Sequence, residues 1–113
     1  MDEQKLSELL ALLSDPTRRK ALALLSEGRE LCVCELMVAL DASQSRMSRH
    51  MAALKAAGLV TDRRDAQWVR YRRVRLRSPS AQRIVDAVLA ATKTTTFAKR
   101  TITRNLGHEE LTT

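Results

Sequence analysis

The hydrophobic pattern of the chain changes its period at Gly58, and this change most constrains the fold. Before it, apolar residues recur at i, i+3, i+4 and i+7, which is the spacing of amphipathic helices. After it, residues 59–64 and 67–74 have the composition and alternation of two strands, with a turn near residues 65–66. A last helix is expected to begin after Pro79. The pattern therefore predicts a mainly helical α+β domain that carries one β-hairpin.

Helix-start and helix-stop residues divide the first part of the chain into four helices. Asp15 and Ser43 are good N-caps, and Pro16 suits a first helical position. Gly28 and Gly58 are expected to end the second and fourth helices. The expected helices are residues 6–13, a second from Pro16 to near Gly28, a short third at roughly 33–40, and a fourth running to about Ala57 with Met47, Met51 and Leu54 inward.

The length of the chain allows one domain with one modest core. Its 113 residues contain no apolar run near the roughly 20 residues that span a bilayer. The N-terminus carries Asp2 and Glu3 instead of the basic and apolar regions of a secretory signal. We therefore expect a cytoplasmic protein with no membrane partner, whose domain covers residues 1–106 and is followed by a frayed tail at 107–113.

Positive charge is concentrated in one third of the chain. Residues 44–77 contain ten basic and two acidic residues, a net charge of +8, whereas the whole chain carries +7 and the remainder therefore −1. A basic run by itself is often only a solvated face. Here the whole excess of positive charge lies in one contiguous segment, and this favours contact with the phosphate backbone of a nucleic acid.

A short helix, a tight turn, a helix with a basic polar face and a basic hairpin follow one another, which is the order of a winged helix-turn-helix. Recognition helices contact bases from their N-terminal end, where glutamine pairs with adenine and arginine with guanine. Arginines beside the hairpin turn would reach a minor groove or the flanking backbone. The residues expected to contact double-stranded operator DNA are Gln44, Ser45, Arg46, Ser48, Arg49, His50, Arg63, Arg64, Arg70 and Arg72.

Two residues of this region allow other roles. His50, beside Met51, suits a structural hydrogen bond, a phosphate contact or a metal ligand, and the structural role is the commonest for a single histidine. Trp68 would pack on the hairpin or stack on a base, and packing is the commoner role. The sequence leaves these alternatives open.

The only two cysteines, Cys32 and Cys34, are one residue apart and precede the expected recognition helix. In a reducing cytosol such a pair more often binds a metal or reacts with oxidants than forms a structural disulfide, although free cysteines also serve as small buried hydrophobes. On a helix, residues two apart lie about 200° apart around the axis, whereas on an extended segment they share one side, about 6.6 Å apart. One ion can therefore bridge the pair only if Cys32 lies at or just outside a helix start, or if the helix unwinds there.

The chain resembles the ArsR/SmtB family of metalloregulatory repressors over most of residues 15–72. The winged-helix stretches are common to the family, and the Cys-Val-Cys box is similar to that of its arsenic- and antimony-sensing branch. The matching stretches, in order, are Asp15-Pro16-Thr17-Arg18, residues 30–36, Ser43-Gln44-Ser45, Ser48-Arg49-His50-Met51, Gly58-Leu59-Val60 and Trp68-Val69-Arg70-Tyr71-Arg72.

The resemblance implies repression of an arsenic-resistance operon, relieved when As(III) or Sb(III) binds Cys32 and Cys34 as inducer, with no organic cofactor. It also implies a homodimer built from the first and last helices. The residues expected at the subunit contact, some of which would also serve the core of their own subunit, are Leu6, Leu9, Leu10, Leu13, Ile84, Val88 and Leu89.

The sequence departs from the family pattern at two places. Met37 stands where the arsenic-sensing box usually has a third cysteine, and the turn of the wing at residues 65–66 lacks the usual glycine. Methionine is a weak ligand and more often a filler of the core. A water, a hydroxide or a small thiol would then complete a trigonal site around the metalloid.

Other functions remain as alternatives. The same fold would serve a thiol-redox or persulfide switch at the two cysteines. A zinc site on the last helix needs histidine, yet the chain has Asp86 there and no histidine between it and His108. An architectural protein would bind DNA without sequence preference.

An enzyme is the least compatible class. An arsenate reductase with a reactive cysteine would need an anion-binding loop on an alternating strand–helix scaffold. The chain has only three glycines, no glycine-rich loop and no such alternation. We therefore expect no catalytic activity.

Overall fold

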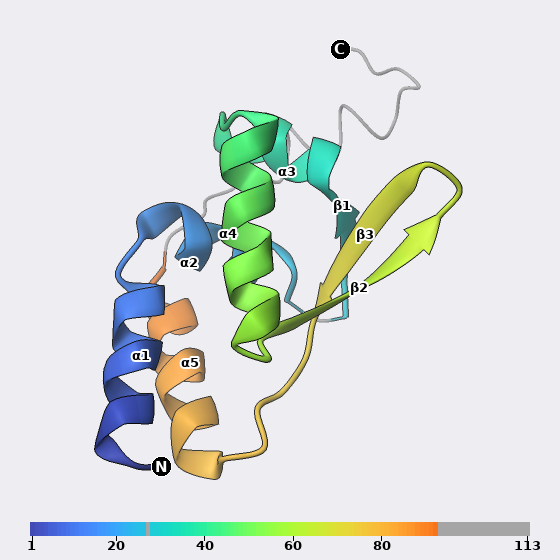
Figure 1. The fold of residues 1–113 in the computed structure, drawn as a ribbon. Coiled ribbons are helices and arrows are strands. Elements are labelled where there is room, and N and C mark those ends of the chain that lie inside the picture. Colours follow the sequence, from blue (N-terminus) through green and yellow to red (C-terminus); the bar gives the residue numbers. More distant parts are fainter. Residues whose placement is uncertain (27, 93–113) are drawn as a thin grey trace.

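The computed structural model describes residues 1–26 and 28–92 (Figure 1). Its elements are, in chain order, α1 (Glu3–Leu13), α2 (Pro16–Leu24), β1 (Glu30–Cys32), α3 (Val33–Leu40), α4 (Gln44–Ala56), β2 (Val60–Asp65), β3 (Trp68–Arg73) and α5 (Pro79–Ala91). The expected order of helices, hairpin and final helix is confirmed, with the short strand β1 in addition. The expected end of the domain at residue 106, the frayed tail at 107–113 and His108 all lie outside the described residues.

The N-caps expected from the sequence are confirmed. The Asp15 carboxylate accepts the backbone N–H of Arg18 at 3.0 Å, and Pro16 occupies the first turn of α2. The Ser43 hydroxyl accepts the backbone N–H of Arg46 at 3.3 Å at the start of α4. Each cap satisfies one of the N–H groups that a helix start leaves without a helical partner. Local chemistry thus decides where both helices begin.

One helix end differs from the expectation. The glycine Gly58 follows α4 with a left-handed φ of 81°, as expected. In contrast, α2 ends at Leu24, and Gly28 lies farther along the loop with φ 75°. Leu25 is the C-cap, because its backbone leaves helical geometry with ψ 10° while its N–H still bonds to the Ala21 carbonyl. The glycine therefore serves the following turn and does not end the helix.

The three strands form an antiparallel sheet in the order β1-β3-β2. In the hairpin, Asp65 pairs with Trp68, so the turn is residues 66–67, one residue later than expected. Ala66 takes a positive φ of 57° at a position where glycine is usual. Strand β1 pairs with β3 through Leu31 opposite Tyr71 and Cys32 opposite Arg70, which joins the cysteine segment to the wing.

The core lies between the five helices and one face of the sheet. The inner face of α4 is the expected one, because Met47, Met51 and Leu54 are completely buried. They join a cluster that includes Leu36 of α3 and Val85 of α5. Helices α1 and α5 lie side by side away from the hairpin (Figure 1). No helix in the described part of the chain has both the length and the hydrophobicity needed to span a bilayer.

Candidate functional site

The cysteine pair lies at the junction of β1 and α3. Cys32 is the last residue of the strand and the N-cap of the helix, with extended backbone angles of φ −83° and ψ 164°. Cys34 follows in the first turn of α3. The two sulfurs form a disulfide, and the Cα atoms are 5.4 Å apart. Cys32 therefore lies just outside the helix, which is the position that the spacing requires if both sulfurs are to meet one ligand.

Glu35 completes the start of α3. Its Oε1 accepts the backbone N–H of Cys32 at 2.8 Å, as the third helical residue does in a capping box. Cys32 is 4% exposed and Glu35 8%, whereas Cys34 is partly exposed, so solvent reaches the junction on the side of Cys34. Glu35 was not among the predicted site residues, although its spacing of three residues from the N-cap is a recognisable signal.

The surroundings of the pair provide sulfur but few other ligands. Met37, at the position of the usual third cysteine, is partly buried and packs against the core. Within residues 1–26 and 28–92, no group of three His, Cys, Asp or Glu side chains is placed to hold a metal ion. The two cysteine sulfurs, which lie together, are the soft donors that a thiophilic ion would meet at this junction.

The outer N-terminal face of α4 is polar and exposed. All the residues of α4 that were expected to contact DNA, apart from His50, are exposed: Gln44, Ser45, Arg46, Ser48 and Arg49. The opposite face is anchored in the core, so these side chains project from a fixed helix. This arrangement is that of a recognition helix, whose first turns present base-contacting groups.

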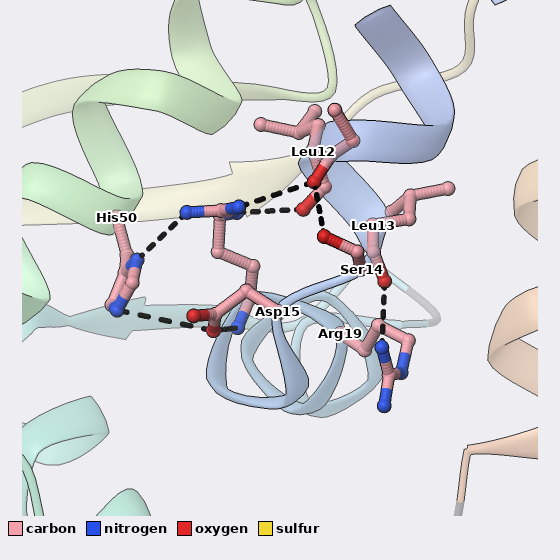
Figure 2. Close-up of polar contacts among 8 residues, drawn as sticks. Leu12, Leu13, Ser14, Asp15, Arg19 and His50 are labelled. Carbon is pink, nitrogen blue, oxygen red and sulfur yellow. Dashed lines mark hydrogen bonds and ion pairs between the residues drawn. The ribbon is translucent and has the colours of Figure 1, made fainter. Parts of the chain in front are cut away.

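His50 lies apart from this exposed row. Its side chain is 14% exposed, and its Nδ1 is 3.3 Å from Nη1 of Arg18 on α2 (Figure 2). Nε2 faces Oδ1 of Asp15 at 3.9 Å. Of the roles left open by the sequence, this geometry favours the structural one. No local signal could have found the contact with Arg18, because 32 residues separate the two positions.

The electrostatics of this network also act on Asp15. Partial desolvation raises the pKa of its carboxyl group. The backbone hydrogen bond from Arg18 and the charges of His50 and Arg18 outweigh that effect, so the pKa of Asp15 lies below its usual range. The cap of α2 therefore remains ionised well into the acidic range, and it keeps a negative charge beside the His50 ring.

The arginines of the wing fall into two groups. Arg63 donates two hydrogen bonds to Glu30 of β1, from Nε at 2.9 Å and from Nη2 at 2.8 Å, and Arg70 pairs with Asp65 at 2.9 Å. Arg64 and Arg72 are exposed, and among the described residues neither forms an ion pair. The structure thus leaves the second group available to a phosphate backbone and ties the first to the protein.

The ion pair of Arg63 bridges the two outer strands of the sheet. The hydrogen bond from Arg63, together with the charges of nearby arginines, holds the pKa of the Glu30 carboxyl below its usual value. Glu30 and Arg63 are 33 residues apart in sequence, so only the sheet brings them together. Trp68, at the tip of this sheet, is 42% exposed.

The residues expected at a subunit contact divide between core and surface. Leu9 and Leu13 are buried in the core of their own chain, whereas Leu10 is 50% exposed. Leu6, Ile84, Val88 and Leu89 are partly buried. A groove of ≈ 470 Å³ is lined by Leu10, Leu13 and Val88, together with residues of α2. Helices α1 and α5 thus keep an accessible apolar surface on the side away from the wing.

The middle of the chain matches a known family of regulators. Residues 15–62 match the family described as bacterial regulatory protein, arsR family. These residues run from the cap of α2 through α3 and α4 into β2. The match thus includes the cysteine junction and the exposed face of α4.

Two curated relatives are similar over about the same region. Over 65 residues the chain is 51% identical to the arsenical resistance operon repressor of Escherichia coli strain K12. These residues make up 58% of this chain and 56% of the relative. Over 60 residues it is 55% identical to the arsenic resistance transcriptional regulator ArsR2 of Pseudomonas putida KT2440, with coverages of 53% and 52%. The chain therefore spans about half the length of the curated relatives that it matches.

A solved structure extends the similarity to most of the fold. Reduced HlyU from Vibrio cholerae N16961 matches with a TM-score of 0.64 and 32% sequence identity, over 78% of this chain and 88% of that one. Most of the fold thus agrees in architecture with a known regulator. The chain belongs to the arsR family of bacterial regulatory proteins.

Proposed function

We propose that this chain is an arsenic-responsive repressor of an arsenic-resistance operon, which leaves its operator when As(III) or Sb(III) binds Cys32 and Cys34. The observation that carries the proposal is the extended backbone of Cys32 at the N-cap of α3, which puts its sulfur beside that of Cys34. The names of the Escherichia coli and Pseudomonas putida relatives support an arsenic signal.

The chemistry of the pair fits a trivalent pnictogen. Thiolates are soft ligands, and arsenic and antimony in this oxidation state are soft and thiophilic. The reduced pair is the reactive form. Arsenous acid would exchange two of its three hydroxyl groups for the sulfurs of Cys32 and Cys34, and the two thiol protons would leave with those hydroxyls as two waters. The third hydroxyl, or a small thiol in its place, completes the trigonal site.

The position of the pair offers two routes to the DNA-binding surface. An ion held between the sulfurs occupies the junction at which the N–H of Cys32 bonds to Glu35, so it disturbs the first turn of α3. Helix α3 packs against α4, and β1 pairs with β3 of the wing. A shift at this one junction would therefore reach both the recognition helix and the hairpin.

The proposed repressor acts as a homodimer on double-stranded DNA. The exposed residues of α4 would read bases, while Arg64 and Arg72 of the wing contact the backbone. The apolar surface of α1 and α5 around Leu10 and Val88 would join the two subunits. A two-fold dimer places two recognition helices roughly 34–36 Å apart, or a multiple of that distance, on one face of the duplex.

The disulfide between Cys32 and Cys34 favours a second candidate, a thiol-redox repressor of the same fold. Oxidation by a peroxide would remove two electrons and two protons from the thiols, form the S–S bond and reduce the peroxide to two waters. This switch would use the same junction, and therefore the same route to the DNA-binding surface. The two candidates differ in the signal alone.

A DNA-shift titration tests the proposal and separates the two candidates. The fully reduced protein is bound to the region upstream of its own operon, and arsenite, antimonite, zinc or peroxide is added in parallel. We expect release by arsenite and antimonite under reducing conditions. Release by peroxide alone would select the redox switch. A reduced protein that takes up no arsenite and stays on the DNA would contradict the arsenic-responsive function.

A further inference from the structure

We propose that Arg18 and His50 are positioning residues that hold the recognition helix against α1, and that protonation of His50 releases this hold and weakens DNA binding. The inference rests on the proposed function only in its DNA-binding part, and it is independent of the inducer. It assigns His50 a role through Arg18 instead of a direct contact with DNA.

Arg18 joins three helices through its guanidinium group. Its Nε donates to the backbone carbonyl of Leu12 at 2.6 Å, and its Nη2 donates to that of Ala11 at 3.3 Å, both in the last turn of α1. Its Nη1 points to His50 on α4 at 3.3 Å. Figure 2 shows this network between the end of α1, the cap of α2 and His50. The rigid fork of an arginine suits three acceptors in fixed directions, which a lysine could not satisfy.

This contact decides which ring nitrogen of His50 carries the proton. A guanidinium group has donors and no acceptor, so a hydrogen bond at this contact requires an unprotonated Nδ1 on His50. The neutral ring then has its proton on Nε2, which faces Asp15. A protonated ring would carry a hydrogen on Nδ1 as well. Two donors with positive charge would then face each other across the gap between α2 and α4.

The charged neighbours of the ring have opposite signs. Asp15 is acidic and Arg18 is basic, and both belong to the start of α2. On α4, Arg46 lies one turn earlier and is exposed. Helix α1 contributes carbonyl groups through Arg18. Among the described residues, no charged side chain of α3 or of the sheet forms a hydrogen bond or ion pair with the ring.

The location of His50 explains why its protonation would affect DNA binding. It follows Arg49 and lies one turn after Arg46, two of the exposed residues proposed to read bases. The other end of the network is α1, which carries the proposed subunit contact. Loss of the link between α1 and α4 would therefore alter the relative placement of the two recognition helices in a dimer. Each subunit contains this link, so the dimer would lose it twice.

The test compares the pH dependence of DNA affinity for the wild-type protein and for His50→Asn, from about pH 8 to about pH 5.5, where histidine ordinarily changes charge. Asparagine keeps an acceptor oxygen for Arg18, has a similar helix propensity and does not titrate. On acidification, we expect wild-type affinity to fall roughly tenfold relative to the variant, the size of one hydrogen bond to a charged group. Parallel pH profiles would overturn the inference.

Two further variants separate positioning from general stability. His50→Leu removes the acceptor and should bind DNA roughly tenfold more weakly at every pH. Ser14→Ala is the matched control, because the Ser14 hydroxyl also donates to the Ala11 carbonyl at the end of α1, at 2.6 Å, but does not contact His50. This variant should keep the wild-type pH profile. A flattened profile in Ser14→Ala, or full affinity in His50→Leu, would contradict the assignment.

The outcomes also distinguish this inference from the proposed function. A wild-type protein that binds DNA with the expected pH profile but ignores arsenite would overturn only the inducer. A wild-type protein that responds to arsenite but shows no pH difference from His50→Asn would overturn only the role of His50. Circular dichroism at each pH checks that every variant is folded, so that a loss of affinity reports on the placement of α4.

Discussion

The starts of α3 and α4 belong to neighbouring, packed helices but differ in chemistry. Helix α3 has Cys32 as its N-cap, whose N–H is held by Glu35, and both residues are nearly closed to solvent. Helix α4 has Ser43 as its N-cap, an ordinary hydroxyl cap, and the residues after it on the outer face are exposed. One start is therefore largely buried and carries two sulfurs, while the other is open and polar.

Under the proposed function, this difference would separate sensing from DNA reading. The largely buried junction would admit a small inducer but exclude a duplex, whereas the open start of α4 would reach into a groove. The two are joined by the contact between α3 and α4 and by the pairing of β1 with β3. We therefore expect that substitutions at the start of α3 remove the arsenite response and leave DNA binding, and that substitutions at the start of α4 do the reverse. Milder substitutions at the caps should reveal the coupling between the two.

The largest effect is expected from Cys32→Ser and Cys34→Ser. A serine hydroxyl is a hard ligand that stays protonated at neutral pH, so arsenite should no longer release the DNA. DNA affinity without arsenite should remain near the wild-type value, because neither cysteine lies on the exposed face of α4. Anisotropy of labelled operator DNA measures both quantities. Normal release by arsenite from either variant would mean that the sensing site lies elsewhere.

The reciprocal change is Arg49→Ala at the start of α4. Loss of a base-contacting arginine costs about 1–3 kcal/mol per contact, and a dimer loses the contact twice. The reduced variant should still bind arsenite with wild-type stoichiometry, measured by thiol titration after removal of unbound arsenite. Arg64→Ala in the wing should instead weaken binding to all sequences and reduce the salt dependence. An Arg49→Ala variant with full operator affinity would exclude this residue from the interface.

A smaller effect is expected at the caps themselves. Glu35→Ala removes the acceptor of the Cys32 N–H, at a cost of about 1 kcal/mol, and should loosen the junction. Less arsenite should then suffice for release. Glu35→Gln is the matched control, since glutamine also accepts in a capping box.

Ser43→Ala costs about 1 kcal/mol at α4 and should lower DNA affinity without changing the arsenite concentration needed for half-release.

The proposed loosening of the junction would be contradicted if Glu35→Ala, like its control Glu35→Gln, needed the same arsenite concentration for release as the wild-type protein. The junction would then transmit the signal without unwinding the first turn of α3. An increase in the arsenite needed by Glu35→Ala would mean that an ordered junction assists capture of the metalloid. Either result changes the proposed coupling and leaves the identity of the ligands intact.

The smallest effect is expected from Glu30→Gln, which removes the exposed ion pair between β1 and the wing. The pKa of Glu30 is lowered, chiefly by the hydrogen bond from Arg63, from its usual value of 4.5. Its contribution to stability is therefore present above the usual pKa and is lost as the pH falls through the lowered one. Urea unfolding should show the wild-type protein slightly more stable at neutral pH and equal to the variant in strong acid. A difference that persists in strong acid would point to packing instead of charge.

Local signals explain which parts of the structure could be predicted. Asp15 and Ser43 act on N–H groups three residues away, so the starts of α2 and α4 were predictable from composition and spacing. The spacing of Cys32 and Cys34 limited the possible geometry of their backbone in the same way. Strand β1 was missed because three residues are too few to show a period, and its pairing partner lies in β3.

The sequence by itself determined the helices, the hairpin and the inner face of α4, because each depends on residues a few positions apart. For the cysteine pair it left two geometries that allow one shared ion, with Cys32 at or just outside the helix start or with a helix that unwinds there. The tertiary structure alone decided that Glu30 meets Arg63 and that Arg18 meets His50. These partners are more than 30 residues apart, so no local pattern relates them. They meet because burial of the shared apolar core brings their helices and strands together, and the polar groups at its edge must then find partners.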